Sequence, residues 1–261
     1  MTRDIDLKDG YQEIVVDDIN NLNIKGRFKS DVLIRVKDCK ELNIDLEVFD
    51  RGKVTLLIWN ESNIETKFNE NYNVDSNSTL NIAYGDLNSS NFIRNTVVNL
   101  NGKYASALVK SASLCKNKKH YSMSVNSNVP YTYGNIENYS VVLDGGNYKM
   151  DATGLIKKGA YKSESHQTSR ALTFDENQVS TIIPNLIIDE NDVMASHATT
   201  VGRIDDNHLV YLQSRGLTLE EVMILISTGY LLPIADFIDN EKLRMDLIQK
   251  IESMVSKECL M

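Results

Sequence analysis

The sequence predicts a β-solenoid followed by a small α-helical cap, and three observations support this fold class. Short runs that alternate with period two, such as "DVLIRV" and "KVTLLIW", extend from Ile14 to about Val193. Within these runs a short phrase returns about every 20 residues. After Ile204 the apolar spacing changes to that of helices. We therefore expect a strand body at 1–204 and a helical region at 205–261.

The recurring phrase "xxNI" is the main argument for stacked turns. Its isoleucines are Ile24, Ile44, Ile64 and Ile82, at intervals of 20, 20 and 18 residues. A unit of this length cannot bury its own apolar face, so successive units stack into a solenoid. We expect the four isoleucines to point inward and the adjacent Asn side chains to form a ladder at a turn. The alternative is a chance recurrence in a sequence rich in Asn and Ile.

The first helix of the helical region is expected in "DDNHLVYLQSRG". Asp205 or Asp206 is the N-cap candidate, and Gly216 is the C-terminal stop. Between them Leu209 and Leu212 share one apolar face. A helix of about three turns fits this segment.

Two further helices follow. Thr218 and Glu221 have the spacing of a capping box that opens "LEEVMILISTG", with Gly229 at its end, and Pro233 interrupts the next segment. The segment "NEKLRMDLIQKIESMV" is amphipathic. Its apolar stripe consists of Leu243, Leu247, Ile251 and Met254. We expect the strand body to stay folded when the segment from about Asp205 to Val255 is deleted.

Composition excludes several functional classes. The chain has 261 residues, 42% of them hydrophobic, and can bury a large core. A net charge of -8 disfavours binding to a phosphate backbone, so no nucleic-acid partner is expected. No apolar run approaches the roughly 18 residues of a membrane span, and the N-terminus has no apolar signal segment. We expect a soluble, cytoplasmic protein with no membrane partner.

The three cysteines lie far apart in the sequence. Cys39, Cys115 and Cys259 show no CxxC or CxxH spacing, which argues against a disulfide framework and against a self-contained zinc or iron-sulfur motif. Cys39 and Cys115 fall in or beside expected strands. We expect them to be buried, unreactive thiols, because neither has a cationic neighbour at helix N-terminal spacing. Cys259 is expected in a fraying tail.

A longer motif joins the two regions. "IIPNLIIDENDVMA" is followed directly by "SHATTVGRIDDNHLVYLQSRGLTLEEV". This stretch resembles the SufB/SufD family of iron-sulfur cluster assembly scaffolds, which reads P-x-L-x-I, an acidic pair and a valine, SH-G-A-T-V-G-x-I-D, and YL-x-SRG-I. The matching residues are Pro184, Leu186, Ile188, Asp192, Val193, Ser196, His197, Thr200, Val201, Gly202, Ile204, Asp205, Tyr211, Leu212, Ser214, Arg215 and Gly216.

The resemblance covers about residues 80 to 258 and implies a right-handed parallel β-helix with a C-terminal helical cap. It implies a non-catalytic scaffold, not an enzyme. Family members pair along their β-helices with a SufB/SufD-type subunit, as homo- or heterodimers, and dock an ABC-type ATPase, SufC, through their C-terminal helices. No Walker A sequence occurs in this chain, so nucleotide chemistry must come from that partner. The long N-terminal helical region of larger members is expected to be missing.

Three departures from the family pattern bear on the site. The SufB branch has a cysteine shortly before the proline segment, and the equivalent "SHQTSRALTFDENQV" has none. Ala198 stands where SufB commonly has Glu and SufD commonly has Gly, and Ala195 stands where some SufD proteins have Cys. The pair Val201-Gly202 favours SufD over SufB.

His197 is the candidate ligand for iron. The resemblance aligns it with a position implicated in cluster assembly, and imidazole is a competent iron ligand. The alternative is a strand-end histidine that hydrogen-bonds a backbone carbonyl. The chain has no intrinsic cofactor in this interpretation. A transient iron-sulfur cluster would lie at a subunit interface, with thiolates from a partner, so we expect His197 to face an interface.

The candidate partner-binding residues lie on the first two helices. Tyr211 and Arg215 are four residues apart and therefore share a helix face. They are candidates for contact with the ATPase, although Arg215 could instead satisfy the carbonyls at the end of its own helix. Glu220 and Glu221, at the start of the second helix, complete the candidate set.

Two other classes stay open at this stage. A β-helix could be a polysaccharide lyase or hydrolase, which needs clustered carboxylates and aromatic platforms for sugars. The single Trp59 and the missing signal segment count against it. The other alternative is an interaction module that uses its solenoid face for a different partner.

Overall fold

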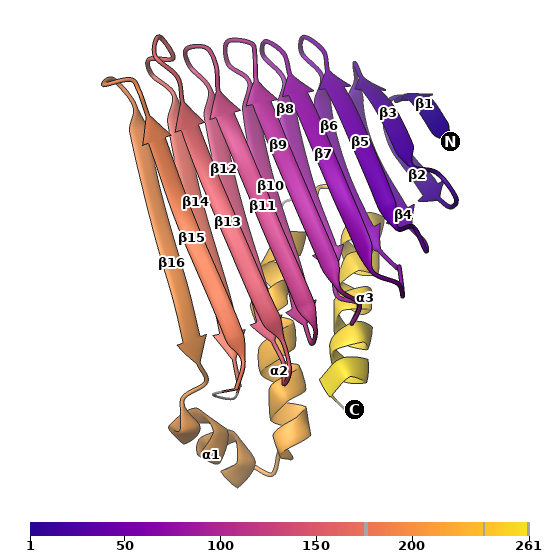
Figure 1. Cartoon of the computed structure of the whole chain (residues 1–261). Helices are drawn as coiled ribbons and strands as arrows, with labels where there is room; N and C mark the ends of the chain where they lie inside the picture. Colours follow the sequence, from indigo (N-terminus) through magenta and orange to yellow (C-terminus); the bar gives the residue numbers. More distant parts are fainter. Residues whose placement is uncertain (175–176, 237, 260–261) are drawn as a thin grey trace.

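The computed structural model shows a two-sheet parallel β-solenoid followed by helices (Figure 1). It describes residues 1–174, 177–236 and 238–259. In this part of the chain the odd-numbered strands form one eight-stranded sheet and the even-numbered strands form the other. Each strand pairs in parallel with the strand two further along the chain. The predicted β-solenoid is therefore confirmed.

The odd-numbered strands are β1 (Thr2–Asp6), β3 (Asn21–Gly26), β5 (Glu41–Val48), β7 (Thr66–Val74), β9 (Phe92–Leu100), β11 (Lys118–Ser127), β13 (Asn147–Ile156) and β15 (Val179–Ile188). The even-numbered strands are β2 (Gly10–Val16), β4 (Lys29–Val36), β6 (Lys53–Asn60), β8 (Thr79–Asp86), β10 (Ser106–Cys115), β12 (Tyr133–Val142), β14 (Glu164–Thr173) and β16 (Met194–Arg203). The helices are α1 (Asp206–Ser214), α2 (Leu219–Leu231), the short 3-10 helix η1 (Leu232–Ala235) and α3 (Glu241–Cys259).

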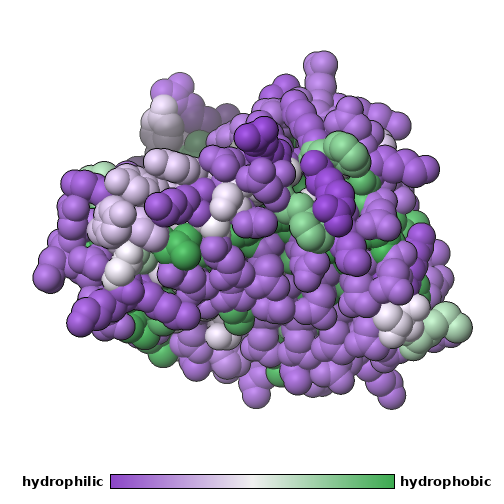
Figure 2. Space-filling view, turned by 90° about the horizontal axis from the view of Figure 1, so that it is seen from above, coloured by the Kyte–Doolittle hydropathy of each residue, from purple (hydrophilic) through white to green (hydrophobic). Residues whose placement is uncertain are grey.

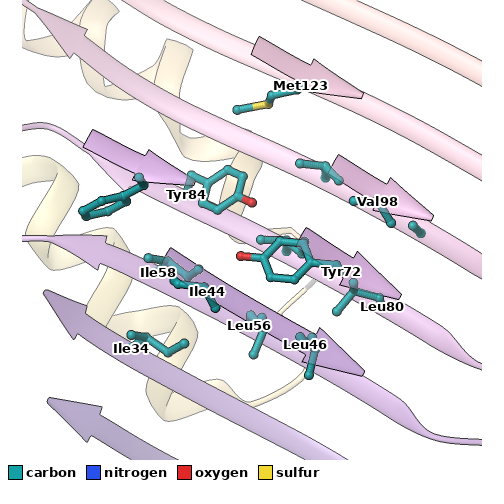
Figure 3. Packing of buried hydrophobic residues seen from close by; sticks show 14 of the residues in the cluster. Ile34, Ile44, Leu46, Leu56, Ile58, Tyr72, Leu80, Tyr84, Val98 and Met123 are labelled. Carbon is teal, nitrogen blue, oxygen red and sulfur yellow. The ribbon is translucent and has the colours of Figure 1, made fainter. Parts of the chain in front are cut away.

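The core lies between the two sheets. Alternate residues of each strand point inward, and the buried side chains stack from one turn to the next (Figure 3). Ile44 and Leu46 of β5 project from one sheet, and Leu56 and Ile58 of β6 project from the other. This continuous apolar stack explains why period-two alternation is the strongest signal in the sequence.

The recurring isoleucines only partly follow the prediction. Ile24, Ile44 and Ile82 are buried, but Ile64 precedes β7 and is 38% exposed. Ile44 pairs with Leu22, so Ile24 and Ile44 are not at equivalent positions. The predicted inward position of Ile64 is therefore wrong.

The fixed period of about 20 residues is also wrong, because the turns lengthen along the chain. The paired residues Thr2 and Asn21 are 19 residues apart, and the paired residues Asn138 and Ser169 are 31 apart. Along the chain the strands become longer and the connecting loops gain residues, while each strand keeps its in-register pairing with its neighbour in the sheet. A repeat search at one fixed spacing therefore detects only the shorter first turns.

Asn side chains form ladders on the outer face of the odd-strand sheet. Asn43 donates to Asn21 at 2.9 Å, Asn69 to Asn43 at 2.9 Å, and Asn95 to Asn69 at 3.0 Å. These residues are paired in register on successive strands, so each amide satisfies the next. The sequence indicated the ladder but not its place, which is a sheet face and not a turn.

Helices cover the outer face of the even-strand sheet. β6 is buried at seven of its eight positions, because its outward side chains lie under the helices. Trp59 lies over Gly85 of β8, the neighbouring strand in the sheet. A Cβ at Gly85 would come within 2.3 Å of the indole ring. The predicted C-terminal helical region is present, and it shares one apolar cluster with this face of the sheet (Figure 1).

The helix boundaries largely follow the predicted caps. Asp205 accepts a hydrogen bond from the Asn207 backbone N–H at 2.8 Å, and Gly216 ends α1 with φ of 97°. Gly229 does not end α2. Its φ is not positive, so the helix continues to Leu231 and passes directly into η1, which contains Pro233.

Charged side chains lie inside the solenoid. Arg94 of β9 is fully buried and donates to Asp86 through Nε at 3.2 Å and through Nη2 at 2.9 Å, and its Nη1 donates to Glu70. The hydroxyls of Tyr84 and Thr96 each donate to Glu70 at 2.7 Å. Burial alone lowers the pKa of Arg94, but the two carboxylates outweigh it and hold that pKa above its ordinary value. The group is therefore a paired ionic layer within an apolar core.

Two buried tyrosines lie beside this ionic layer. Tyr72 and Tyr84 come from opposite sheets and reach into the space between them (Figure 3). Burial raises the pKa of both phenols well above the ordinary value, and Glu70 adds to the effect. Both tyrosines therefore stay neutral. The Tyr84 hydroxyl donates to Glu70, whereas the buried Tyr72 hydroxyl has no hydrogen-bond partner among the described residues.

Candidate functional site

The C-terminal end of the solenoid is open. β15 and β16 form the last turn, and no further strand pairs with their outer edges in the part of the chain that the structure describes. Inward-facing residues of this turn are consequently only half-buried or exposed, as Ile182 and Val201 show. The edge thus offers unpaired backbone N–H and C=O groups beside apolar side chains.

His197 lies on this open turn. It belongs to β16 and pairs with Gln167 of β14, so its side chain shares the inward direction of Gln167. Gln167 is 2% exposed, whereas His197 is exposed because no further turn covers it. The strand-end position in the alternative interpretation of His197 is wrong, because His197 lies within β16, which runs on to Arg203.

Polar atoms near this end are incompletely satisfied. The amide of Gln167 donates to the Asn185 carbonyl at 2.8 Å, but its buried Oε1 has no hydrogen-bond partner among the described residues. The buried Ser180 hydroxyl on β15 also has no hydrogen-bond partner among the described residues. Unpaired buried polar atoms also occur elsewhere in the described structure, for example at Asn60 and Tyr72, so they are not specific to this end.

The two ends of the solenoid differ in charge. At the N-terminal end β1 carries Arg3, Asp4 and Asp6, and such charges discourage another strand from pairing. At the other end β15 has no charged residue, and β16 has only Arg203 besides His197. The C-terminal edge therefore lacks the charges that protect the N-terminal edge.

The described residues do not bring thiolates to His197. Within 1–174, 177–236 and 238–259, no group of three His, Cys, Asp or Glu side chains is placed to hold a metal ion. Cys39 lies between β4 and β5, and Cys115 ends β10. The side chain of Cys259 lies outside the described residues. The role of His197 as an iron ligand stays a prediction.

Cys39 and Cys115 are buried free thiols, as predicted. Burial raises the pKa of both, and each thiol donates to a nearby carbonyl at 3.1 Å, Cys39 to Glu41 and Cys115 to Asn117. A raised pKa and low exposure both reduce the reactive thiolate.

We expect both thiols to react slowly with Ellman's reagent in the native protein. In a Cys259→Ser variant, their reaction at pH 8 should be at least about a hundredfold slower than in urea, because it needs local opening. The release of thionitrobenzoate measures the two rates. Equal rates in the native and unfolded protein would contradict the buried placement.

The candidate partner-binding residues lie on exposed helix surfaces. Tyr211 is 55% exposed, and the Arg215 guanidinium donates to its hydroxyl at 3.2 Å and lies 5.1 Å from its ring centre. The predicted shared face is confirmed. α1 has no buried residue, so its side chains are available to another molecule.

Glu220 and Glu221 lie in the first turn of α2 and are exposed. Glu221 accepts from the Thr218 backbone N–H at 2.8 Å, and its own N–H donates to the Thr218 hydroxyl at 3.2 Å. The predicted capping box is confirmed. Glu221 therefore stabilises the start of α2. The Glu220 carboxylate makes no capping hydrogen bond of this kind in the described structure.

A groove that the sequence did not reveal lies between the end of β14, α1 and α2. Its volume is about 550 Å³, and mainly apolar side chains line it, among them Leu172, Ile204, Leu212 and Ile226. Tyr211 forms part of its wall. The groove joins the open turn to the exposed helix α1, because Ile204 directly follows β16.

Comparison with protein families gives a match along most of the chain. The model described as "SUF system FeS cluster assembly, SufBD core domain" matches residues 15–230. The chain belongs to the SufBD family. The resemblance seen in the motif around His197 is thus confirmed over most of the chain.

Curated SufBD relatives agree with this assignment. The chain is 37% identical over 122 residues to the iron-sulfur cluster assembly protein SufD of Bacillus subtilis, covering 47% of this chain and 28% of the relative. It is 28% identical over 183 residues to a SufBD family protein of Mycobacterium tuberculosis, covering 69% of this chain and 22% of that protein. SufD of Escherichia coli is 27% identical over 112 residues, or 43% and 26% of the two chains. The chain thus spans about a quarter of the length of these relatives.

No single helix among the described residues is long and apolar enough to cross a membrane. One pair of helical segments, Asp206–Ser214 and Leu219–Ala235, reaches the required length and composition together, but it is bent by 118°.

Proposed function

We propose that this SufBD protein is a non-catalytic scaffold subunit of a SUF iron-sulfur cluster assembly complex. It pairs through the open end of its solenoid with a SufB- or SufD-type subunit and docks a SufC-type ABC ATPase on its helical region. The observation that carries the proposal is the unpaired edge formed by β15 and β16, in which Arg203 is the one charged residue besides His197. The family assignment favours this role over a polysaccharide lyase or a solenoid module with an unrelated partner.

The pairing follows from the edge itself. A second solenoid related by a two-fold axis would place its own last strands antiparallel to β15 and β16, which satisfies the free backbone groups of both chains. The same contact would cover Ile183, Ile187 and Val201, which are 40%, 47% and 49% exposed. His197 would then face the partner subunit.

The proposed cargo is a transient iron-sulfur cluster. Imidazole binds iron through a neutral nitrogen, so His197 would supply one nitrogen ligand at the interface and the partner would supply the thiolates. The buried thiols Cys39 and Cys115 are consistent with the reducing conditions of the cytoplasm, the compartment that we propose.

The proposed ATPase site is the exposed surface of α1 with the adjoining groove. Tyr211 and Arg215 form an exposed aromatic–cation pair there, and these residue types often dominate binding at interfaces. Glu220 adds an acidic group at the neighbouring start of α2.

Co-purification with SufB- and SufC-type partners tests the proposal. Val201→Lys places a charge on the open turn and is expected to prevent pairing, whereas Val97→Lys on the outer face of the odd-strand sheet is the matched control and should pair normally. Arg215→Ala is expected to weaken retention of the ATPase at least tenfold without affecting pairing. Size-exclusion chromatography of the co-expressed subunits measures both effects.

His197 variants test the cargo separately. His197→Ala and His197→Asn should leave the complex assembled but reduce its iron and sulfide content, because an amide is a poor iron ligand. Full iron and sulfide in the His197→Asn complex would show that the residue is structural. Unchanged pairing in Val201→Lys would remove the basis for the proposed interface.

A further inference from the structure

Three successive loops carry a row of exposed tyrosines at the upper end of the solenoid. The loops 101–105, 128–132 and 157–163 each lead from an odd-numbered strand to the next even-numbered one (Figure 1). The tyrosines Tyr104, Tyr131 and Tyr161 are 59%, 38% and 40% exposed. The rings of Tyr104 and Tyr131 stack at 5.2 Å, and Tyr161 meets Tyr131 edge-on at 5.4 Å. We call this row the aromatic ridge.

Two of the tyrosines occupy an unfavourable backbone conformation. The φ angles of Tyr104 and Tyr131 are 63° and 62°, in the left-handed region that bulky residues rarely adopt. The preceding loop has Asn77 in the same conformation, with φ of 57°, and a short polar residue tolerates it much better. Asn or Gly would relieve the backbone at both positions. Strain that is kept in an exposed loop points to a use for the side chain.

The same loops are basic on an acidic protein. They carry Lys103, Lys157, Lys158 and Lys162 and no Asp or Glu, while the whole chain has a net charge of -8. Lys162 pairs with Asp192 at 2.9 Å, whereas the other three lysines are exposed and form no ion pair among the described residues. Figure 2 looks onto this end, where residues of intermediate hydropathy gather at one side of a largely hydrophilic surface.

We propose that the aromatic ridge and its lysines dock an extended acidic segment of another protein. Tyrosines supply rigid contact area and hydroxyl groups, and the lysines attract carboxylates and steer the approach. Nucleic acid fits less well, because the Tyr104 and Tyr131 rings each cover one face of the other, and the chain as a whole has a net charge of -8. The ridge lies on loops at the end of the solenoid opposite α1, so it is distinct from the proposed ATPase site (Figure 1).

Fluorescence anisotropy with a labelled octaglutamate peptide tests the proposal on the full chain. The peptide should bind, lose affinity as salt rises, and bind at least tenfold more tightly than octaglutamine. The Tyr104→Asn/Tyr131→Asn double variant should weaken binding at least tenfold. Its Tm should stay within about 3 °C of the wild type, because relief of the backbone offsets the lost ring contact.

The lysines are tested with a matched control. Lys103→Gln/Lys158→Gln should weaken octaglutamate binding, and Lys118→Gln, at the opposite end of the solenoid, should leave it unchanged. Equal affinity of the wild type and the double tyrosine variant would overturn the proposal, as would tighter binding of a labelled dT20 oligonucleotide than of octaglutamate. A fall in Tm of more than about 6 °C in the double variant would assign the tyrosines to stability and also overturn it.

Discussion

Replacing Arg94 with Met is expected to lower the free energy of unfolding by about 3–5 kcal/mol. The variant leaves Glu70 and Asp86 buried without the guanidinium that pairs with both. Methionine fills most of the space but donates no hydrogen bond. Unpaired carboxylates between the sheets must then ionise at high cost or take up protons. Urea unfolding followed by circular dichroism measures the loss.

Two comparisons separate this effect from the loss of a surface charge. Arg51→Met removes a guanidinium whose side chain is 83% exposed, and it should change the free energy of unfolding by no more than about 0.5 kcal/mol. Adding Glu70→Gln and Asp86→Asn to Arg94→Met should recover part of the loss, because neutral amides cost less to bury. An Arg94→Met protein as stable as the wild type would show that the ionic layer contributes nothing.

The sequence contained a signal for this layer that composition alone does not reveal. In "KFNENYNV" the inward positions are Phe68, Glu70, Tyr72 and Val74. In "FIRNTVVNL" Arg94 occupies an inward position. A charged residue in phase with buried neighbours is a candidate for a buried ion pair. Which residues pair depends on how successive turns stack, because Arg94 reaches Glu70 on the preceding turn, 24 residues earlier in the chain. Alternation within one strand does not encode that distance.

The fold class was predictable because independent sequence signals indicated the same elements. Alternation, caps at Asp205 and Thr218, and the apolar stripe of the last helix all described the correct elements. The turn length was not predictable from "xxNI", since the loops grow while the register holds. The predicted helix end at Gly229 was wrong. A glycine at a helix end adopts the left-handed conformation, and the φ angle of Gly229 is not positive.

The candidate site was predictable only in part. The motif around His197 identified the family, and helical spacing placed Tyr211 beside Arg215. The exposure of His197 follows from the absence of a further turn beyond β16 in the described structure, which strand patterning does not show. The lack of charge on β15 was visible in the sequence and would have marked that edge.

Ending the chain after Arg203 is expected to yield a strand body that aggregates, in contrast to the folded body that the sequence alone suggested. The helices cover an apolar face of the even-strand sheet, where Leu57, Trp59 and Val141 are between 0% and 4% exposed. Each such side chain loses about 1.5–3 kcal/mol when it is returned to water. A contiguous apolar face of this kind also invites association between copies.

Solubility after centrifugation and binding of the dye ANS measure the outcome. The full chain should be soluble and bind little dye, and the truncated chain should sediment or bind it strongly. Adding Leu57→Thr, Trp59→Thr and Val141→Thr to the truncated chain should restore solubility, since Thr suits an exposed strand. A truncated chain that stays soluble and binds no ANS would contradict the shared core.

A point variant of the full chain isolates the docking of α3 from the loss of chain length. Ile251 is fully buried against the sheet, so Ile251→Asp places an unpaired carboxylate in the shared cluster. We expect α3 to detach, ANS binding to rise and the Tm to fall by roughly 6–16 °C for a loss of about 3–4 kcal/mol. Met245→Asp, on the 49% exposed face of the same helix, is the matched control and should behave as the wild type. If both variants melt alike, the helix is held by contacts other than this apolar face.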